Sequence, residues 1–394
     1  MKHAFQGFDG KDAILVSLFA IVSGVVFYMM YGLHDETLVS SINDVWFQSD
    51  LKRVFENMTD RHARGHYRVK VHPLHSLFTF PPTLALRKLG VTPFKAVQIV
   101  TASIASGYVV AMFLLLRALG CIRFDAVVFS VLGSVSSAAL FWLSVPECYA
   151  LGATSIAVGL LLAALASEKK QAGWKYVAAS AFSLSATVTN WMTGILSTFV
   201  GNHWKRTVVL TVLALSTVAL LWGLEKHFFP NAVFFIGDRE EGRYLFSPTF
   251  GRVVEVFNTF VFHTIVSPAV TMAGTTQTGW PLLSMQSSWP GSSGLLGQIG
   301  VIVWSPLLAI GIWAFFTLKT LAGLRIVLGL TVLGQLGLHL LYGSETFLYA
   351  LHFLPLLVTV AALSTRSHLR IPALALALVL IPVAGMNNWW QFNA

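Results

Sequence analysis

Runs of about 20 apolar residues recur along the entire chain, and few folds accommodate them. A helix of that length crosses a hydrocarbon core of about 30 Å. Charged residues make up only 11% of the chain, whereas soluble domains usually contain about 25%. The sequence therefore predicts an all-α integral membrane protein, a polytopic helical bundle in which residues 1–394 form a single membrane domain.

The apolar runs predict about 11 membrane spans. The run at 191–203 is short for a span, and the other boundaries are expected to hold within a few residues. The predicted spans lie near residues 12–33, 94–116, 124–145, 148–167, 174–190, 191–203, 206–226, 297–318, 322–342, 346–364 and 370–386.

Basic residues fall in every second connection, which predicts the orientation of the chain. With the N-terminus inside, the cytoplasmic connections are Arg117 to Arg123, "SEKKQAGWK", "NHWKR", "LKTLAGLR" and "STRSHLR". Two long loops, 34–93 and 227–296, are then external. Residues 253–274 either span the membrane or lie along its surface. We favour the surface, because a span there would move the last two basic loops outside.

Net charge and cysteine content exclude two further classes of protein. The net charge of +9 fits basic cytoplasmic loops better than nucleic-acid binding. The two cysteines, Cys121 and Cys148, cannot form a disulfide framework and are interpreted as small apolar residues.

The external loop 34–93 is unusually polar for this chain. Residues 34–72 contain 12 of the 43 charged residues, and residues 34–75 contain five of the 12 histidines. A polar loop next to the first span suits chemistry on a substrate with one end in the bilayer. We therefore predict that this loop is catalytic.

Two amphipathic helices are expected within this loop. In "DLKRVFENM", Leu51, Val54, Phe55 and Met58 recur at helical spacing, which predicts a helix lying flat on the membrane with its apolar face down. Asp50 would stand at its edge. A second helix is expected in "HPLHSLF", with Pro73 in its first turn and "FPP" ending it.

Acidic residues of this loop are candidates for a general base toward an incoming hydroxyl. Asp50 is the favoured residue, although it also fits a helix N-cap. Asp44 and Asp35 are the alternatives, and Asp35 is also a candidate for the acceptor cavity. Glu147, in "SVPECY" between two spans, is either a second acidic residue of the cavity or a residue at the membrane interface.

Basic residues of the same loop are candidates for binding a departing phosphate. The group comprises Arg64, Arg68, Lys70 and His72, and binding of lipid headgroups is the alternative interpretation. His72 and His75 lie three residues apart and make a divalent metal an alternative, but no second histidine pair supports it. No cofactor is expected.

A late span carries three further polar residues, Glu345, Tyr349 and His352. Their spacing of i, i+4 and i+7 predicts one shared helix face. Glu345 and Tyr349 are assigned to the acceptor cavity. His352 lies about two turns into the span, where ionisable groups usually face a cavity. It is assigned to the donor phosphate, with a packing histidine as the alternative.

Three short motifs resemble the GT-C superfamily of glycosyltransferases that use polyprenyl-phosphate sugars, including protein O-mannosyltransferases and the aminoarabinose transferase of lipid A. "KVHPLH" stands where that superfamily has a "KPPL"-like element. "SVPECY" resembles its second acidic turn, and "ETFLYALHFLPLLVTVAAL" resembles its late "RYLLPLLPLL"-like span. The chain departs from the pattern because it lacks a sizeable C-terminal soluble domain and the arginine that begins the late motif. "HDET" also resembles the usual acidic pair.

The resemblance implies a fold, a reaction and a location. A GT-C enzyme transfers a sugar from a polyprenyl-phosphate donor to a hydroxyl of a glycan, lipid or protein acceptor, with inversion. Its partners would be these substrates and membrane lipids, with no nucleic acid. It would lie in a bacterial inner membrane, with its site facing the periplasm or exterior. The alternative is a transporter or flippase of a lipid-linked saccharide, although no inverted repeat is evident. A polysaccharide polymerase would differ mainly in its acceptor.

Overall fold

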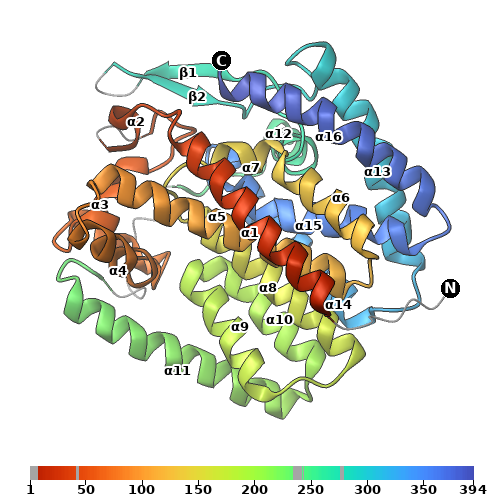
Figure 1. The fold of residues 1–394 in the computed structure, drawn as a ribbon, viewed down its shortest axis with the longest axis horizontal. Coiled ribbons are helices and arrows are strands. Elements are labelled where there is room, and N and C mark those ends of the chain that lie inside the picture. Colours follow the sequence, from red (N-terminus) through yellow and green to blue (C-terminus); the bar gives the residue numbers. More distant parts are fainter. Residues whose placement is uncertain (1–7, 41–43, 234–241, 243, 276–278) are drawn as a thin grey trace.

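The computed structural model describes residues 8–40, 44–233, 242, 244–275 and 279–394. Helices dominate the described part of the chain, and its only sheet is a two-stranded antiparallel hairpin. Figure 1 shows the long helices packed side by side, with the hairpin at one margin of the bundle. The predicted all-α class is confirmed.

Eight helices in the described part of the chain are long and apolar enough to cross a membrane. This confirms the membrane class, while the expected number of about eleven spans is not confirmed. The eight are α1 (Gly10–Tyr31), α5 (Pro93–Ala118), α8 (Tyr149–Glu168), α11 (Trp204–Phe228), α13 (Leu295–Thr317), α14 (Ala322–Leu341), the segment Thr346–Arg366 that contains α15 (Ala350–Leu363), and α16 (Arg370–Phe392).

The three remaining predicted spans are helical but shorter than a span. Residues 124–145 form α6 (Arg123–Ser134) and α7 (Ser137–Trp142), because Ser136 caps the second helix with a 3.3 Å bond from the Ala139 amide. Residues 174–203 form α9 (Gly173–Ala186) and α10 (Trp191–Gly201), joined by the turn Val188–Asn190.

Helices α9 and α10 are too short to cross a membrane because the turn that connects them lies inside the protein. With 14 and 11 residues they are about 21 and 17 Å long, against about 30 Å for the hydrocarbon core. Asn190 is fully buried and donates to the Gly152 carbonyl at 3.1 Å, while Gln335 donates to its oxygen at 3.0 Å. The turn between the two helices is therefore held by α8 and α14.

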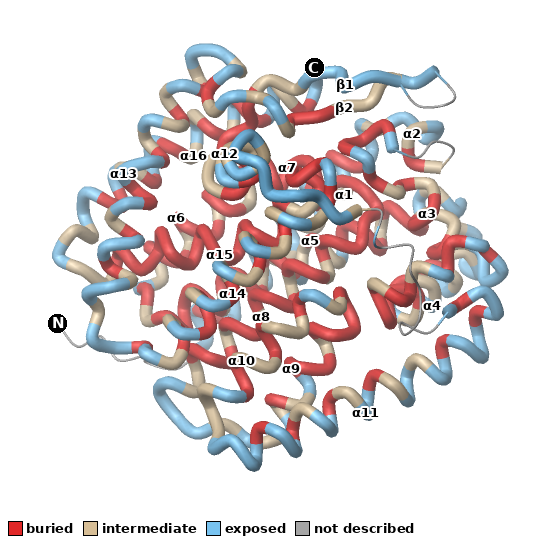
Figure 2. Tube along the Cα trace, turned by 180° about the vertical axis from the view of Figure 1, so that it is seen from behind, coloured by how far each residue is buried: buried red, intermediate tan, exposed pale blue. Residues whose placement is uncertain are grey.

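The centre of the bundle is formed by α8 and α15, and every residue of α15 is buried. Figure 2 shows this buried centre and places α11 at the edge, where most of its surface is exposed. An exposed surface of leucine, valine and phenylalanine is the expected surface of a helix that faces lipid.

The shorter elements lie in the two predicted external loops. The first loop contains α2 (Glu36–Ser40), α3 (Leu51–Thr59), a 3₁₀ segment (Arg64–Lys70) and α4 (His75–Lys88). The second contains α12 (Phe250–Asn258), a π-helical turn (Thr259–His263), β1 (Thr271–Thr275) and β2 (Pro281–Ser284), with Thr271 paired to Ser284. Residues 253–274 thus form no continuous spanning helix.

The prediction that the apolar face of α3 rests on lipid is wrong. Leu51, Val54 and Met58 are buried within the protein, where Val54 and Met58 pack with Tyr31 and Val97. The apolar stripe was correctly located, but its partner is the rest of the protein rather than lipid. An amphipathic stripe shows only that one face of a helix is buried. Burial against lipid and burial against the rest of the protein give the same pattern.

The predicted limits of the following helix are also wrong. Helix α4 begins at His75, beyond Pro73, and continues through Pro81 and Pro82 to Lys88. Proline normally weakens a helix interior because it lacks an N–H group. Here the buried face holds the helix together: Thr79 and Thr83 donate to carbonyls one turn earlier, at 2.8 and 2.7 Å.

The orientation predicted from the basic loops can be tested with single cysteines. We expect Arg61→Cys to react in intact cells with a membrane-impermeant maleimide, and Lys170→Cys to react only after the cells are opened. Both positions are exposed, so access to the reagent alone decides the result. Labelling of residue 170 from outside would reverse the orientation. The parent chain, with Cys121 and Cys148 buried, is the background control.

Candidate active site

A strained loop before α3 positions Asp50. Asp44, Phe47 and Gln48 have positive φ angles of 70°, 53° and 59°, which non-glycine residues rarely adopt. Such strain persists only where the surroundings enforce it, and it is frequent at functional sites.

Three contacts hold this loop in place. The Trp46 indole donates to the Phe141 carbonyl at 3.2 Å, the Leu283 amide donates to the Val45 carbonyl at 2.9 Å, and the Ser344 hydroxyl donates to the Gln48 side chain. The ring of Phe47 is fully buried among aromatic side chains of the core. The backbone just before Asp50 is therefore held by three other segments of the chain.

Two of the predicted acidic residues meet, although 97 positions separate them. The Asp50 amide donates to Glu147 Oε1 at 2.9 Å, and the Cys148 amide donates to Glu147 Oε2 at 2.8 Å. The Asp50 carboxylate accepts from Arg53 Nη2 at 2.9 Å. Asp50 occupies the N-cap position of α3, but its side chain makes no capping bond. Its carboxylate therefore points to Arg53 and stays 38% exposed.

Burial controls the charges of this cluster. Burial raises the pKa of Glu147 to about 7, although Arg53 lowers it and backbone amides bond both of its oxygens. Burial opposes the charge on Arg53 and is the largest single effect, but Asp50, Glu147 and Cys148 together outweigh it and raise the Arg53 pKa. Asp50 thus has a permanent cation beside it, while Glu147 joins the Asp50 loop to the turn before α8.

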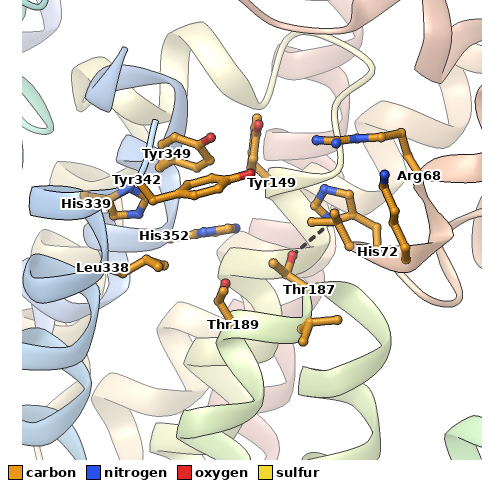
Figure 3. A pocket seen from close by; sticks show the side chains of 13 residues that line it. Arg68, His72, Tyr149, Thr187, Thr189, Leu338, His339, Tyr342, Tyr349 and His352 are labelled. Carbon is orange, nitrogen blue, oxygen red and sulfur yellow. Dashed lines mark hydrogen bonds between the residues drawn. The ribbon is translucent and has the colours of Figure 1, made fainter. Parts of the chain in front are cut away.

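The structure also contains a cavity of about 260 Å³. Asp50, Arg53 and Glu147 do not line it, but Tyr149, two residues after Glu147, forms part of its wall. Figure 3 shows side chains converging on it from segments far apart in the sequence. Five of the predicted residues are among them. The lining residues are Arg68, Lys70, Val71, His72, Tyr149, Thr187, Val188, Thr189, Leu338, His339, Tyr342, Tyr349 and His352.

One wall of the cavity is basic. Arg68 and Lys70 come from the end of the 3₁₀ segment, and the Lys70 ammonium lies 5.2 Å from the centre of the Tyr67 ring. Arg64, from the start of the same segment, is exposed and does not line the cavity. The structure therefore brings two of the three predicted arginine and lysine side chains to the cavity.

His72 differs from its expected role as a cation. Burial lowers its pKa well below the usual histidine value, and the nearby charges of Arg53 and Arg68 act in the same direction. Its Nδ1 lies 2.9 Å from the Ala186 carbonyl, so Nδ1 carries the proton and donates it. His72 is therefore a neutral hydrogen-bonding group in this wall.

The opposite wall consists of aromatic and histidine side chains. Tyr149 meets His352 with ring centres 5.4 Å apart, and His339 meets Tyr349 at 4.4 Å. Among the described residues, the buried His352 Nε2 has no hydrogen-bond partner. A buried polar atom without a partner is unusual, and this nitrogen lies against Gly152 of α8.

Gly152 permits this arrangement of His352. A Cβ atom at Gly152 would lie 2.2 Å from His352 Nε2 and 3.0 Å from the Asn190 side chain. Only glycine allows α8, α15 and the turn between α9 and α10 to approach so closely at this depth.

Six predicted residues do not line the cavity: Asp50, Glu147 and Arg64, described above, and Asp35, Asp44 and Glu345. Asp35 is exposed and accepts from the Thr37 amide at 2.7 Å; the Thr37 hydrogen bonds lower its pKa. Asp44 is exposed in the strained loop. Glu345 is buried and accepts from Ser284 Oγ at 2.5 Å. The predicted shared face with Tyr349 and His352 therefore excludes Glu345, because α15 begins only at Ala350, after a 3₁₀ turn.

Glu345 makes the packing of β2 against it, through the bond from Ser284, dependent on pH. Burial raises its pKa to about 7, and the Ser284 bond partly opposes this. The folded state therefore binds the proton more tightly than the unfolded chain. The resulting stabilisation is complete below the ordinary value of 4.5 and is lost as pH rises through about 7.

We expect the thermal unfolding midpoint to fall between about pH 5 and pH 8, and Glu345→Gln to flatten that fall. Glu147→Gln is measured in parallel, because the pKa of Glu147 is also raised. It shows how much Glu147 contributes to the pH dependence of the unfolding midpoint. An unchanged pH profile in Glu345→Gln would assign the effect elsewhere.

Sequence reasoning missed several residues of the cavity, notably Tyr149, Tyr342, Thr187 and His339. His339 carries the signal that identified His352, an ionisable residue within a span. Among the described residues, no group of three or more His, Cys, Asp or Glu side chains could hold a metal ion. No protein-family model matches the chain, and no curated protein matches it.

Proposed function

We propose that this protein is an integral-membrane glycosyltransferase of the GT-C type. It transfers a sugar from a polyprenyl-phosphate donor to an acceptor hydroxyl at the external face of a bacterial inner membrane. The observation that carries this proposal is the cluster of Asp50, Arg53 and Glu147, which the chain joins through Tyr149 to a cavity with one basic wall and one aromatic wall.

Asp50 is the general base in this proposal. Its carboxylate is partly exposed, so an incoming hydroxyl can reach it, and Arg53 fixes its orientation. Glu147 is a positioning residue, because it is buried and each of its oxygens already accepts a backbone amide. A base held in this way accepts the proton as the acceptor oxygen attacks the anomeric carbon.

Arg68 and Lys70 bind the departing phosphate. Breaking the bond between the sugar and the phosphate leaves negative charge on the phosphate oxygens, and preformed cations stabilise that charge. The tyrosines opposite supply flat apolar faces and hydroxyl groups, which suit a sugar ring. The turn at Thr187 to Thr189 also lines the cavity and is assigned to the start of the donor's lipid tail.

The test is incubation of the purified protein with a panel of polyprenyl-phosphate sugars, following release of the free polyprenyl phosphate. Release with one donor and with an acceptor alcohol present supports the proposal. Movement of the intact lipid-linked sugar across proteoliposomes, without release, would instead make the protein a flippase.

A further inference from the structure

Helix α12 reverses the usual distribution of polar and apolar side chains. Phe250, Val253 and Phe257 share one face and are 84%, 40% and 49% exposed. Arg252 and Glu255 instead point toward the protein, where Glu255 accepts from Ser287 at 2.9 Å and from Gln286 at 3.3 Å. A helix that faces water has its charged residues outside. The outer face of α12 is therefore suited to lipid.

Arg252 fastens α12 to the end of α14. Its guanidinium donates to the carbonyls of His339 at 2.8 Å, Leu340 at 2.8 Å and Gly343 at 2.6 Å. The last carbonyls of a helix lack partners within the helix and carry partial negative charge. One arginine thus caps the C-terminal turn of α14.

The segment before α12 adds a second connection to the same place. The Phe246 amide donates to the Leu341 carbonyl at 2.8 Å, and the Gly343 amide donates to the Tyr244 carbonyl at 3.0 Å. This end of α14 provides Leu338, His339 and Tyr342 to the cavity. Residues 244–258 therefore support one wall of the cavity from its outer side.

We propose that α12 is a lipid-docked brace for this wall. Phe250, Val253 and Phe257 insert at the boundary between lipid headgroups and acyl chains, and Arg252 transmits that anchorage to the end of α14. The bilayer is the occupant because Arg252 fastens α12 to the end of the spanning helix α14, whose own exposed surface is apolar, with Leu333 and Leu341 64% and 48% exposed. The brace is independent of the reaction that the cavity supports.

Docking is tested with single spin labels on the full chain in vesicles of phosphatidylethanolamine and phosphatidylglycerol. Labels at Phe250→Cys and Phe257→Cys are expected to collide with oxygen and to be shielded from a water-soluble nickel chelate. A label at the exposed Arg61 is expected to show the opposite. Nickel access at Phe257 equal to that at Arg61 would overturn the proposal. Dipolar broadening between labels would also overturn it, because a second copy would then cover the face.

Transmission is tested by hydrogen exchange of residues 338–343 in the same vesicles. Arg252→Gln removes hydrogen bonds from a charged donor, so exchange there is expected to rise about tenfold or more. Phe250→Asn/Phe257→Asn is expected to raise it in the same segment, with α8 unchanged as the reference. Arg252→Lys should restore protection only in part, because an ammonium cannot reproduce the planar guanidinium.

Two results would contradict the proposal that Arg252 transmits the lipid anchorage of α12 to the end of α14. If Arg252→Gln leaves exchange unchanged, the cap does not hold the wall. If Arg252→Gln raises exchange while the double phenylalanine variant does not, Arg252 caps α14 without help from the bilayer. Neither result depends on the identity of the donor, so a failed transfer assay leaves this test intact.

Discussion

Asp50→Asn is expected to lower turnover by about 10² or more while the protein still folds and purifies. Asparagine keeps the shape of the side chain, and its carbonyl oxygen still accepts from Arg53, but it cannot take a proton from the acceptor hydroxyl. Asn also serves at an N-cap position as well as Asp does. The measurement is steady-state transfer at saturating donor, with the thermal unfolding midpoint as the check on folding.

Asp44→Asn is the matched control for this prediction. Asp44 lies in the same loop with a positive φ angle that asparagine also tolerates, and it is exposed. We expect nearly full activity. Loss of activity in Asp44→Asn with normal activity in Asp50→Asn would move the base to Asp44. Normal activity in both, and in Asp35→Asn, would contradict an acid–base role for the whole loop.

Arg68→Ala and Lys70→Ala are each expected to remove about 2–4 kcal/mol of transition-state stabilisation, a loss of roughly 10² to 10³ in turnover. Both residues line the cavity, where a cation near the departing phosphate acts with little screening by water. The measurement is single-turnover release of polyprenyl phosphate, which separates the chemical step from donor binding.

Arg64→Ala provides the control from the same 3₁₀ segment. It removes the same charge from an exposed position outside the cavity, so we expect less than a twofold change in turnover. If all three variants behave alike, the segment only attracts anionic headgroups. If all three are normal, no phosphate is bound at this wall.

The membrane class was predictable because length and hydropathy decide it locally, one segment at a time. The positions where helices end, and the course of α4 through its prolines, were less predictable. The turn at Asn190 depends on partners in α8 and α14, and the path of α4 through Pro81 and Pro82 depends on its buried threonines. The partners of Asn190 lie 38 and 145 positions away, outside any local window of sequence.

The candidate site was predictable by chemistry but not by geometry. Asp50 stood out at the edge of an amphipathic stripe and Glu147 near the end of a span, yet nothing in the sequence indicates that the Asp50 amide bonds Glu147. Arg64 and Arg68 looked equivalent, and only the course of the 3₁₀ segment separates them. His72 looked like a cation, but the depth of its burial makes it neutral.

The strained loop before α3 also sets the order in which the protein can mature. Its contacts at Phe141, Leu283 and Ser344 belong to segments that leave the ribosome long after residue 50. Until those segments insert, nothing opposes relaxation of the positive φ angles at Phe47 and Gln48. A chain halted at residue 280 would contain Asp50, Arg53 and Glu147 but would not hold the loop in its strained form. The proposed site would therefore be complete only after the last third of the chain has folded against this loop.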